Sequence, residues 1–349
     1  MSLYDFSCNP GVAWLNVNQA CNMRCKWCYC AQSGYIPTKE MSLTLAKELV
    51  DISVNIGISH FNIIGGEPTL WPHLFQLISY MRDKGKTIGL ITNATRFGDD
   101  LFWSKYINCP ADRISVSVKS ASAVEYKQVV GSNDFSKTML GIKRAISFHE
   151  VGITTVFNSL VGLEGLKKIG KACREMNANS IIVNMCSPVL NKEGTGDAGF
   201  SIPIEELANS TISALEYLLP LYEGNVEFDI QMPLCLFPKD FVIKYGMENR
   251  KLMTLCHVFS RSGINYDIEG NVTVCNEFTS KIAKRGVDFS DGQSLIRHLN
   301  TVQVKDYYSE ILRYPSVECD LCDWKGECRG GCLMNWLIYE PSICHPITL

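Results

Sequence analysis

The sequence predicts an α/β protein, a partial (β/α)6 barrel followed by a small, irregular, cysteine-rich domain. From residue 12 to about residue 220, short β-rich apolar runs alternate with longer runs of helical period. Such alternation favours a parallel sheet with right-handed crossovers. The alternation fades beyond Gly224, and from Cys256 onward the chain is rich in Cys, Gly and Asp. These changes in sequence pattern and composition separate the barrel from the second domain.

Each barrel unit is expected from the period of its apolar residues. The expected strands are Val12–Val17, His60–Ile64, Thr87–Ile91, Arg113–Val118, Thr154–Leu160 and Ser180–Met185. The expected helices between them are Ser42–Ile56, His73–Lys84, Asp100–Ile107, Lys137–Glu150 and Gly165–Met176. Ser42 is a suitable N-cap for the first helix. Six units are too few for a closed eight-unit barrel, so an incomplete barrel is predicted, with an open sheet as the alternative.

The remaining chain is expected to be less regular. A helix over Ile204–Leu219 should end at Pro220, because proline cannot continue a helix, and Asp267–Gly270 has the composition of a hairpin turn. The predicted organisation is an N-terminal extension (1–11), the barrel (12–225), a linker (226–255) and the cysteine-rich domain (256–349).

Composition excludes several classes of protein. With 46% hydrophobic and 20% charged residues, the chain is typical of globular proteins. Its net charge of −3 argues against general binding to nucleic acid or an anionic membrane. No apolar run approaches the roughly 20 residues of a membrane span, and the first residues lack the pattern of a signal peptide. We therefore expect a cytoplasmic protein with no nucleic-acid or membrane partner.

Cysteine content points to metal chemistry. Sixteen cysteines in 349 residues are too many for an average enzyme. Disulfide scaffolds are usually short and secreted, whereas a reducing compartment keeps thiols available as metal ligands. Some of the sixteen can be buried thiols that act as small hydrophobes, but this does not explain their spacing.

The first cysteine motif follows the first expected strand and reads Cys21-Asn-Met-Arg-Cys25-Lys-Trp-Cys28. Three thiolates can hold three irons of a cubane cluster and leave the fourth iron open for another ligand. Zinc is the alternative, but it needs four ligands and therefore a distant partner.

Polar motifs follow the next three expected strands. Gly65-Gly66-Glu67-Pro68 combines glycines that let a backbone approach a ligand with a carboxylate that can accept a hydrogen bond from an ammonium group. Asn93 lies at the end of the third strand, and Ser117 and Lys119 lie at the end of the fourth. Barrels of this type place their chemistry at the carboxyl ends of strands, so these residues and the cysteine loop are expected to form one site.

The second cysteine field occupies the C-terminal third. Cys256 and Cys275 flank Gly270, and a denser run and one last cysteine follow; these are Cys319, Cys322, Cys328, Cys332 and Cys344. A zinc ribbon explains a C-x2-C pair with two further cysteines, but it leaves Cys256, Gly270 and Cys275 without a role.

Together these motifs resemble the radical S-adenosylmethionine (SAM) superfamily with a C-terminal SPASM domain. The resemblance implies a TIM-like partial barrel in which Cys21, Cys25 and Cys28 bind a [4Fe–4S] cluster whose open iron is chelated by SAM. Reductive cleavage of SAM then gives a 5′-deoxyadenosyl radical. On the same grounds, contacts to SAM are expected from the aromatic residue of the cysteine motif, from the Gly-Gly-Glu motif that binds the SAM amino group in this family, and from polar residues at two strand ends. These residues are Trp27, Gly65, Gly66, Glu67, Asn93 and Ser117.

The same resemblance implies two auxiliary [4Fe–4S] clusters. The first would be held by Cys256, Cys275 and Cys332, with Cys235 as a candidate for its fourth ligand; the second would be held by Cys319, Cys322, Cys328 and Cys344. In the sulfatase-maturing branch an Asp after the second SPASM cysteine serves as base. Here Asn276 occupies that position and cannot take a proton, which disfavours that activity.

The resemblance favours an enzyme that modifies a ribosomally made peptide by crosslinking, oxidation or epimerisation. Six cysteines lie outside the cluster motifs: Cys8, Cys30, Cys109, Cys173, Cys186 and Cys235. We interpret Cys30 as a bystander, and Cys186 and Cys235 as candidate hydrogen donors. The expected partners are a separate leader-binding protein and an electron donor of the flavodoxin or ferredoxin type. The alternatives are a small-molecule epimerase or dehydrogenase acting on an aminoglycoside-type sugar, and an iron–sulfur electron carrier or redox sensor.

Overall fold

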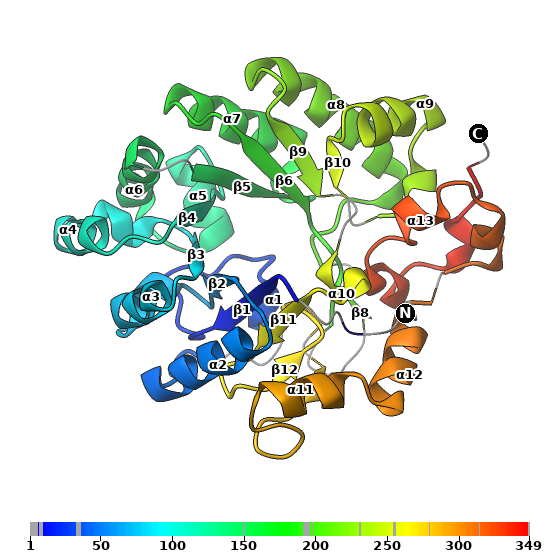
Figure 1. Cartoon of the computed structure of the whole chain (residues 1–349). Coiled ribbons are helices and arrows are strands. Elements are labelled where there is room, and N and C mark those ends of the chain that lie inside the picture. The colour runs from blue at the N-terminus through cyan, green and yellow to red at the C-terminus, as the bar shows by residue number, and fades with distance from the viewer. Residues whose placement is uncertain are drawn as a thin grey trace.

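A computed structural model of the chain describes residues 6, 10–32, 36–148, 151–190, 196–197, 199–229, 232–253, 256–278, 280–313 and 315–347. Its centre is one large sheet, of which the strands curve around the middle of the view in Figure 1. The strands of this sheet are β1 (Val12–Asn16), β2 (His60–Ile64), β3 (Thr87–Thr92), β4 (Arg113–Ser117), β5 (Val151–Phe157), β6 (Ile181–Met185), β9 (Val226–Asp229), β10 (Leu252–Met253), β11 (Gly263–Tyr266), β12 (Val272–Thr273) and β13 (Lys281–Ala283).

The order of strands across the sheet is β10-β9-β6-β5-β4-β3-β2-β1-β11-β12-β13. Neighbours from β10 to β11 pair in parallel, whereas β11–β12 and β12–β13 are antiparallel. Two short strands outside this sheet, β7 (Val189–Leu190) and β8 (Gly196–Asp197), pair with each other. Since the large sheet has two free ends, the barrel is open, as the sequence predicts.

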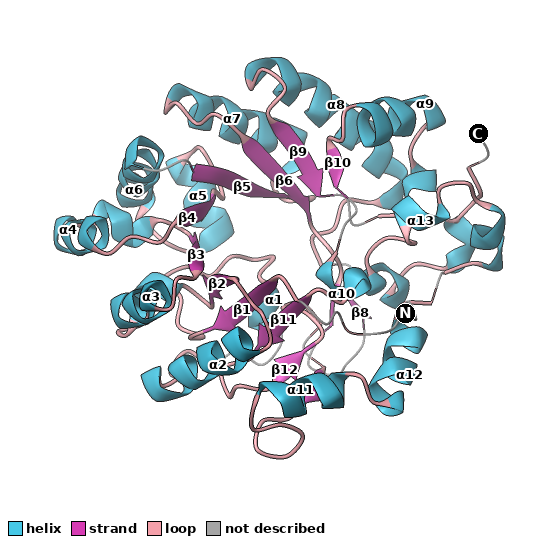
Figure 2. Ribbon diagram, viewed as in Figure 1, coloured by secondary structure: helices cyan, strands magenta, loops and turns pink. Residues whose placement is uncertain are grey.

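Helices cover the outer face of the barrel, as Figure 2 shows. The described α-helices of the chain are α1 (Tyr29–Gln32), α2 (Leu43–Asn55), α3 (Leu74–Asp83), α4 (Asp100–Asn108), α5 (Ala123–Val130), α6 (Phe135–Phe148), α7 (Gly162–Glu175), α8 (Ile204–Leu221), α9 (Lys239–Val242), α10 (His257–Ser260), α11 (Gly292–Leu299), α12 (Val302–Ile311) and α13 (Lys325–Cys328). No described helix is both long and apolar enough to cross a membrane.

Several predicted boundaries are wrong, among them both ends of the fifth strand and the end of the helix that contains Pro220. The fifth strand starts at Val151 rather than Thr154, because Val151 and Ile153 are buried in the core. It ends at Phe157 because the Asn158 side chain turns the chain by accepting hydrogen bonds from Leu160 N and Val161 N. Helix α8 continues through Pro220 to Leu221, since a proline in the last turn removes a single backbone hydrogen bond.

Three described features extend the predicted fold. Helix α5 was not expected, although Ser122 caps its start and Gly131 ends it with a φ of 63°. The predicted linker (226–255) contains β9 and β10, both of which extend the barrel sheet. Strand β11, from the predicted cysteine-rich domain, pairs in parallel with β1. The two regions of the chain therefore share one sheet.

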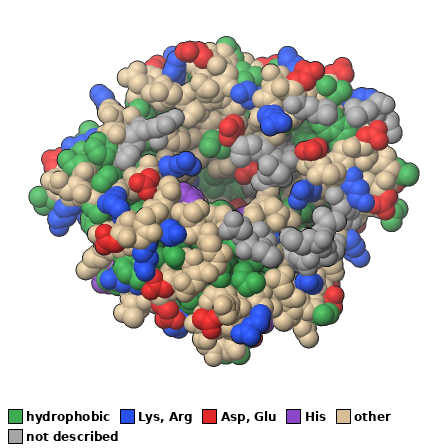
Figure 3. Space-filling view, in the orientation of Figure 1, with side chains coloured by type: hydrophobic (Ala, Val, Ile, Leu, Met, Phe, Trp, Pro, Cys, Tyr) green, Lys and Arg blue, Asp and Glu red, His purple; other side chains and the backbone are tan. Residues whose placement is uncertain are grey.

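Strand alternation separates the core from the barrel interior. In β2, Phe61 and Ile63 are fully buried, whereas His60 and Asn62 on the opposite face are partly exposed. The latter two line a hollow of about 520 Å³ whose wall also includes Ser115. Figure 3 shows the surface hollowed near the centre of the same view. The interior is therefore a chamber lined by both polar and apolar side chains rather than a second packed core, and it has room for a ligand.

Candidate functional site

The first cysteine loop follows β1 and rests on the end of α5. Backbone hydrogen bonds join Arg24 N to Val130 O (2.7 Å) and Lys26 N to Val129 O (3.1 Å). Trp27 is 8% exposed and packs in a small apolar cluster with Met23, Tyr126, Val129 and Val130. Trp27, which the sequence predicts as a cofactor contact, thus packs against α5 and anchors the loop there. The loop is held by its non-cysteine residues, so its thiols need not pack in the core.

The thiols of this loop are partly accessible and close to one another. Cys21, Cys25 and Cys28 are all half-buried. Burial raises the pKa of Cys21 to about 12, and the charge of Glu67 and the other two thiols add to the rise. Burial likewise raises the pKa of Cys25, which the Lys119 ammonium opposes. Such thiols ionise readily only when a metal binds them, and three partly exposed thiols in one short loop fit the three-ligand cluster that the spacing predicts.

Cys30 has a closer relation to this loop than the sequence suggested. Its side chain is hydrogen-bonded to that of Cys28, and this bond, followed by burial, raises the pKa of Cys30 well above its ordinary value. Cys30 is therefore a neighbour of a candidate ligand rather than a remote bystander. The spacing C-x-C at Cys28 and Cys30 was the available signal.

Glu67 forms the centre of a buried hydrogen-bond network at the ends of β2 and β3. Its Oε1 accepts from Thr69 N (3.1 Å), Thr69 Oγ1 (2.6 Å) and Thr92 Oγ1 (2.6 Å), and its Oε2 accepts from Asn93 N (2.8 Å). Burial raises the pKa of Glu67, and these four bonds oppose the rise. Because each carboxylate oxygen has about two acceptor positions, the single bond to Oε2 leaves one position on that oxygen for an ammonium group.

Gly65 and Gly66 permit a close approach between two backbone segments. Gly66 N donates to Asn18 O (2.8 Å), and Glu67 N donates to Ala20 O (2.7 Å). A Cβ on Gly66 would lie 2.5 Å from Ala20 O and 2.5 Å from Gln19 O. In the structure the two glycines therefore bring their loop against the chain that enters the cysteine loop.

Asn93 and Ser117 lie at neighbouring strand ends. Asn93 Nδ2 donates to Asn22 Oδ1 (2.8 Å), which ties the end of β3 to the cysteine loop. Ser117 accepts a hydrogen bond from Lys119 Nζ. The structure thus brings Glu67, Asn93 and Lys119 together with the cysteine loop on one side of the barrel, as the strand-end argument predicts.

The first of the two C-terminal cysteine sets comprises Cys256, Cys275 and Cys332. Burial raises the pKa of all three thiols, and the charges of Cys256 and Cys275 add to the rise for Cys332, which places the three together. Backbone N–H groups of Val258 and Phe278 donate to the sulfurs of Cys256 (3.4 Å) and Cys275 (3.1 Å). Apolar side chains that include Val258, Val274, Tyr308 and Leu333 surround this set. Buried thiols with amide donors suit a cluster shielded from water.

A polar pair connects this set with the barrel. Asn276 Oδ1 accepts from Asn16 Nδ2 (3.0 Å) at the end of β1. The next residue, Glu277, is hydrogen-bonded to Ser187 after β6; burial raises its pKa to about 7, and the charge of Asp229 at the end of β9 adds to the rise. Glu277 was missed by the sequence analysis, which considered only the position before it.

Cys186, a predicted hydrogen donor, lies near this carboxyl group. Burial raises the pKa of Cys186 to about 12, with a further contribution from the charge of Glu277. The thiol therefore keeps its proton at neutral pH. It also lines a small hollow with Met185, Met232 and Tyr339.

The second C-terminal set contains five cysteines around one hollow: Cys235, Cys319, Cys322, Cys328 and Cys344. Leu234 N donates to the sulfur of Cys328 (3.2 Å) and Ile347 N to that of Cys322 (3.4 Å). Cys235 was considered as a ligand of the first set, but the structure places it here, hydrogen-bonded to Cys344. Because the short helix Leu234–Leu236 follows the end of β9, it delivers Cys235 to this side of the domain.

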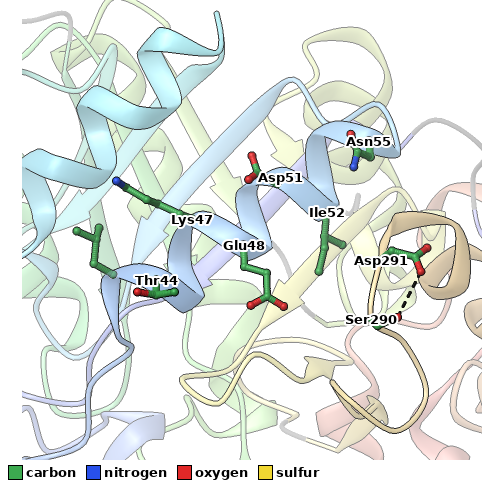
Figure 4. A pocket seen from close by; sticks show the side chains of 9 residues that line it. Thr44, Lys47, Glu48, Asp51, Ile52, Asn55, Ser290 and Asp291 are labelled. Carbon is green, nitrogen blue, oxygen red and sulfur yellow. Dashed lines mark hydrogen bonds between the residues drawn. The ribbon is translucent and has the colours of Figure 1, made fainter.

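The other cysteines and cavities add no comparable cluster. Cys109 follows the last residue of α4 and Cys173 lies on α7, both in the outer layer, and Cys8 lies outside the described residues. Among the described residues no three His, Cys, Asp or Glu side chains converge on a point suited to a single metal ion. A groove of about 470 Å³ lies on the outer side of α2, between Glu48, Asp51 and Asp291 (Figure 4). Its position on the helical layer separates it from the strand ends.

Comparison with known proteins agrees with this geometry. Residues 15–172 match the family model described as the radical SAM superfamily. A probable GTP 3′,8-cyclase of Methanococcus maripaludis is 28% identical over 169 residues, which cover 47% of this chain and 55% of that protein. The chain thus spans about half the length of the curated relatives that it matches.

Two solved structures share the fold over nearly the whole chain. SuiB of Streptococcus suis, bound to its precursor peptide SuiA, aligns with a TM-score of 0.70 at 13% identity and covers 97% of this chain and 75% of that one. Native anSMEcpe with bound AdoMet and the Cp18Cys peptide aligns with a TM-score of 0.64 at 17% identity, covering 92% and 88%. The family model thus matches the part of the chain that carries the first cysteine loop and the strand-end residues Glu67 and Asn93, and the solved structures show that the fold is shared.

Proposed function

We propose that this chain is a radical SAM enzyme of the SPASM type that modifies a peptide. The observation that carries the proposal is the arrangement at the carboxyl ends of the strands. There the three-cysteine loop lies beside Glu67 and Asn93, and Asn276, next to Cys275, is hydrogen-bonded to Asn16 at the end of β1. A [4Fe–4S] cluster on the first loop would supply the electron that cleaves SAM into methionine and a 5′-deoxyadenosyl radical, which abstracts hydrogen from a substrate C–H group. Two auxiliary [4Fe–4S] clusters would occupy the C-terminal sets.

The residues of the chain have defined tasks in this proposal. Glu67 fixes the end of β3 against the cysteine loop and offers the remaining acceptor position of Oε2 to the SAM ammonium. Lys119 lies beside the loop, where its charge favours the ionised thiols that a cluster needs. The apolar shell of the first C-terminal set excludes water from an electron acceptor next to the substrate. Together these residues orient SAM and shield the radical.

A peptide is the favoured substrate because SuiB and anSMEcpe, the proteins with which the chain shares its fold, are bound to peptides in their solved structures. The reaction would be an oxidation, a crosslink or an epimerisation. We infer a separate leader-binding protein, a flavodoxin- or ferredoxin-type electron donor and a cytoplasmic location. Cys186 is the candidate hydrogen donor for epimerisation, because it keeps its proton and lies near Glu277 just after β6, whereas Cys235 lies in the second C-terminal set.

A small-molecule substrate is the second candidate. The observation in its favour is the similarity of residues in the barrel to a probable GTP 3′,8-cyclase. A chamber lined in part by polar groups such as Asn62 and Ser115 can also hold a sugar or nucleotide.

The test is anaerobic co-expression with a small peptide encoded beside the gene, in ordinary and in deuterated water, followed by mass spectrometry. The control replaces Cys21, Cys25 and Cys28 with Ala. Loss of two hydrogens that depends on these cysteines would support a peptide oxidase or crosslinking enzyme. Gain of one solvent deuterium would support an epimerase, and C186A should then abolish that gain. An unmodified peptide, with SAM still cleaved, would favour the small-molecule reading.

A further inference from the structure

The second C-terminal set holds one thiol more than a cubane cluster can use. Five cysteines line its hollow, namely Cys235, Cys319, Cys322, Cys328 and Cys344, whereas a [4Fe–4S] cluster takes four thiolates. The motif accounts for four of the five. Cys235 comes from a different part of the chain, the short helix Leu234–Leu236 after β9.

The hydrogen bonds around the hollow show where the fifth thiol lies. The sulfurs of Cys322 and Cys328 each accept a backbone N–H group, from Ile347 and Leu234 respectively. Amide donors of this kind are typical of sulfurs that bind iron. The side chains of Cys235 and Cys344 are instead hydrogen-bonded to each other. Two thiols therefore occupy one corner of the hollow.

The corner is built for both thiols. The backbone N–H of His345, the residue after Cys344, also donates to the Cys235 side chain, so one chain segment fixes both sulfurs. On the other side Leu234, the residue before Cys235, donates to Cys328. The segment that carries Cys235 is thereby attached to the same ring of sulfurs as the motif cysteines.

We propose that Cys235 and Cys344 share one corner of the second auxiliary cluster. One binds the iron as a thiolate, the other donates its S–H to that sulfur, and either can take the ligand position. Exchange breaks one Fe–S bond and forms another, and the incoming thiol passes its proton to the departing thiolate, so charge and electrons balance. This inference rests on the proposed second auxiliary cluster and leaves the first cluster with three cysteine ligands.

The test is the iron content of anaerobically reconstituted full-length protein. Wild type should hold about twelve irons, four for each cubane. C235A and C344A should each keep about twelve, whereas the double variant should fall to about eight. C319A removes a corner with no spare thiol and should also fall to about eight, whereas C109A, at the end of the outer helix α4, should keep about twelve. The retained eight irons report that the variants have folded.

A second measurement is the reduction potential of the retained cluster. C235A and C344A should each lower it relative to wild type, because each variant loses the hydrogen bond to the ligating sulfur that stabilises the more negative, reduced state. A drop to about eight irons in C344A or in C235A alone would overturn the shared corner. About eight irons in wild type itself, with SAM still cleaved, would contradict the second auxiliary cluster and the pair together, while leaving the radical SAM function standing.

Discussion

Replacing Glu67 with Gln tests how the buried carboxylate is used. All four groups that bond to Glu67 are able to donate, and two of them are backbone N–H groups, of Thr69 and Asn93. A Gln side chain keeps one acceptor oxygen and presents an NH2 group to at least one of these backbone donors. If the oxygen stays with the two Thr hydroxyls, Asn93 N loses its partner and faces another donor. A buried N–H group left unpaired costs about 1–3 kcal/mol.

Amide hydrogen exchange of the segment around Asn93 is the direct assay. Local opening should become easier by the same 1–3 kcal/mol, so exchange should accelerate roughly 5- to 150-fold. E48Q is the matched control, because Glu48 pairs with Arg285 on the half-exposed outer side of α2 and such a pair contributes about 0–1 kcal/mol. Unchanged exchange at Asn93 in E67Q would refute the role of Glu67 as the centre of this network.

Titration with SAM then separates the network from the ligand contact. T69V removes one hydroxyl donor to Glu67 and leaves the carboxylate and its charge in place. If Oε2 also accepts from the SAM ammonium, E67Q should weaken SAM binding by the roughly 1.5–3 kcal/mol of a charged hydrogen bond, about 10- to 150-fold, and T69V should weaken it far less. Equal losses in the two variants would assign the effect to the network alone.

Three further predictions follow from the cysteine loop and the chamber. W27A removes the side chain that packs against the loop, so it should destabilise that region by about 3–5 kcal/mol and lower the iron content by about four irons. W27F should keep the stability of the region and the full iron content. Full iron content in W27A would contradict the anchoring role of Trp27. G66A should displace the Gln19–Ala20 segment, since its Cβ would meet two carbonyl oxygens at 2.5 Å, and calorimetry should show SAM binding weakened at least tenfold. A Cβ on Gly11 would meet no atom within 4 Å, so G11A should bind SAM as wild type does. Burial lowers the pKa of His60, so the folded state favours the neutral ring and loses stability as the pH falls from about 6.5 through the folded pKa. The melting temperature of wild type, measured relative to that of H60Q, should therefore fall between pH 7.5 and pH 5.5. A constant difference between the two melting temperatures would contradict this assignment.

The sequence predicted those parts of the fold in which local signals and burial agree. Ser42 was expected to cap a helix, and its side chain accepts from Leu45 N. The second strand, with alternating burial from His60 to Ile64, has the predicted bounds. In both cases the period of the apolar residues is also the period of the packed face, so the pattern alone is sufficient.

The missed features depend on contacts between residues far apart in the chain. The strand β11 has four residues, three of them buried, without polar alternation, and its partner β1 lies some 250 residues earlier. Helix α5 has only eight residues, and its role in holding the cysteine loop follows from two hydrogen bonds across about 100 residues. The Glu67 network likewise requires the ends of β2 and β3 to meet, which a motif at one strand end does not reveal.

The pairing of β1 with β11 also explains how two cysteine sets on distant segments, the first loop and the set that contains Cys275, keep a fixed geometry. Strand β1 leads into the first cysteine loop, and its parallel neighbour β11 leads through β12 to Cys275. Adjacent strands lie about 4.8 Å apart, and the bond between Asn16 and Asn276 joins them again where both segments leave the sheet. Electron transfer between clusters depends steeply on their separation, so a second domain attached by a hinge would transfer electrons poorly. A continuous sheet instead holds Glu277 and the first C-terminal set at a fixed distance from the loop at which the radical would form.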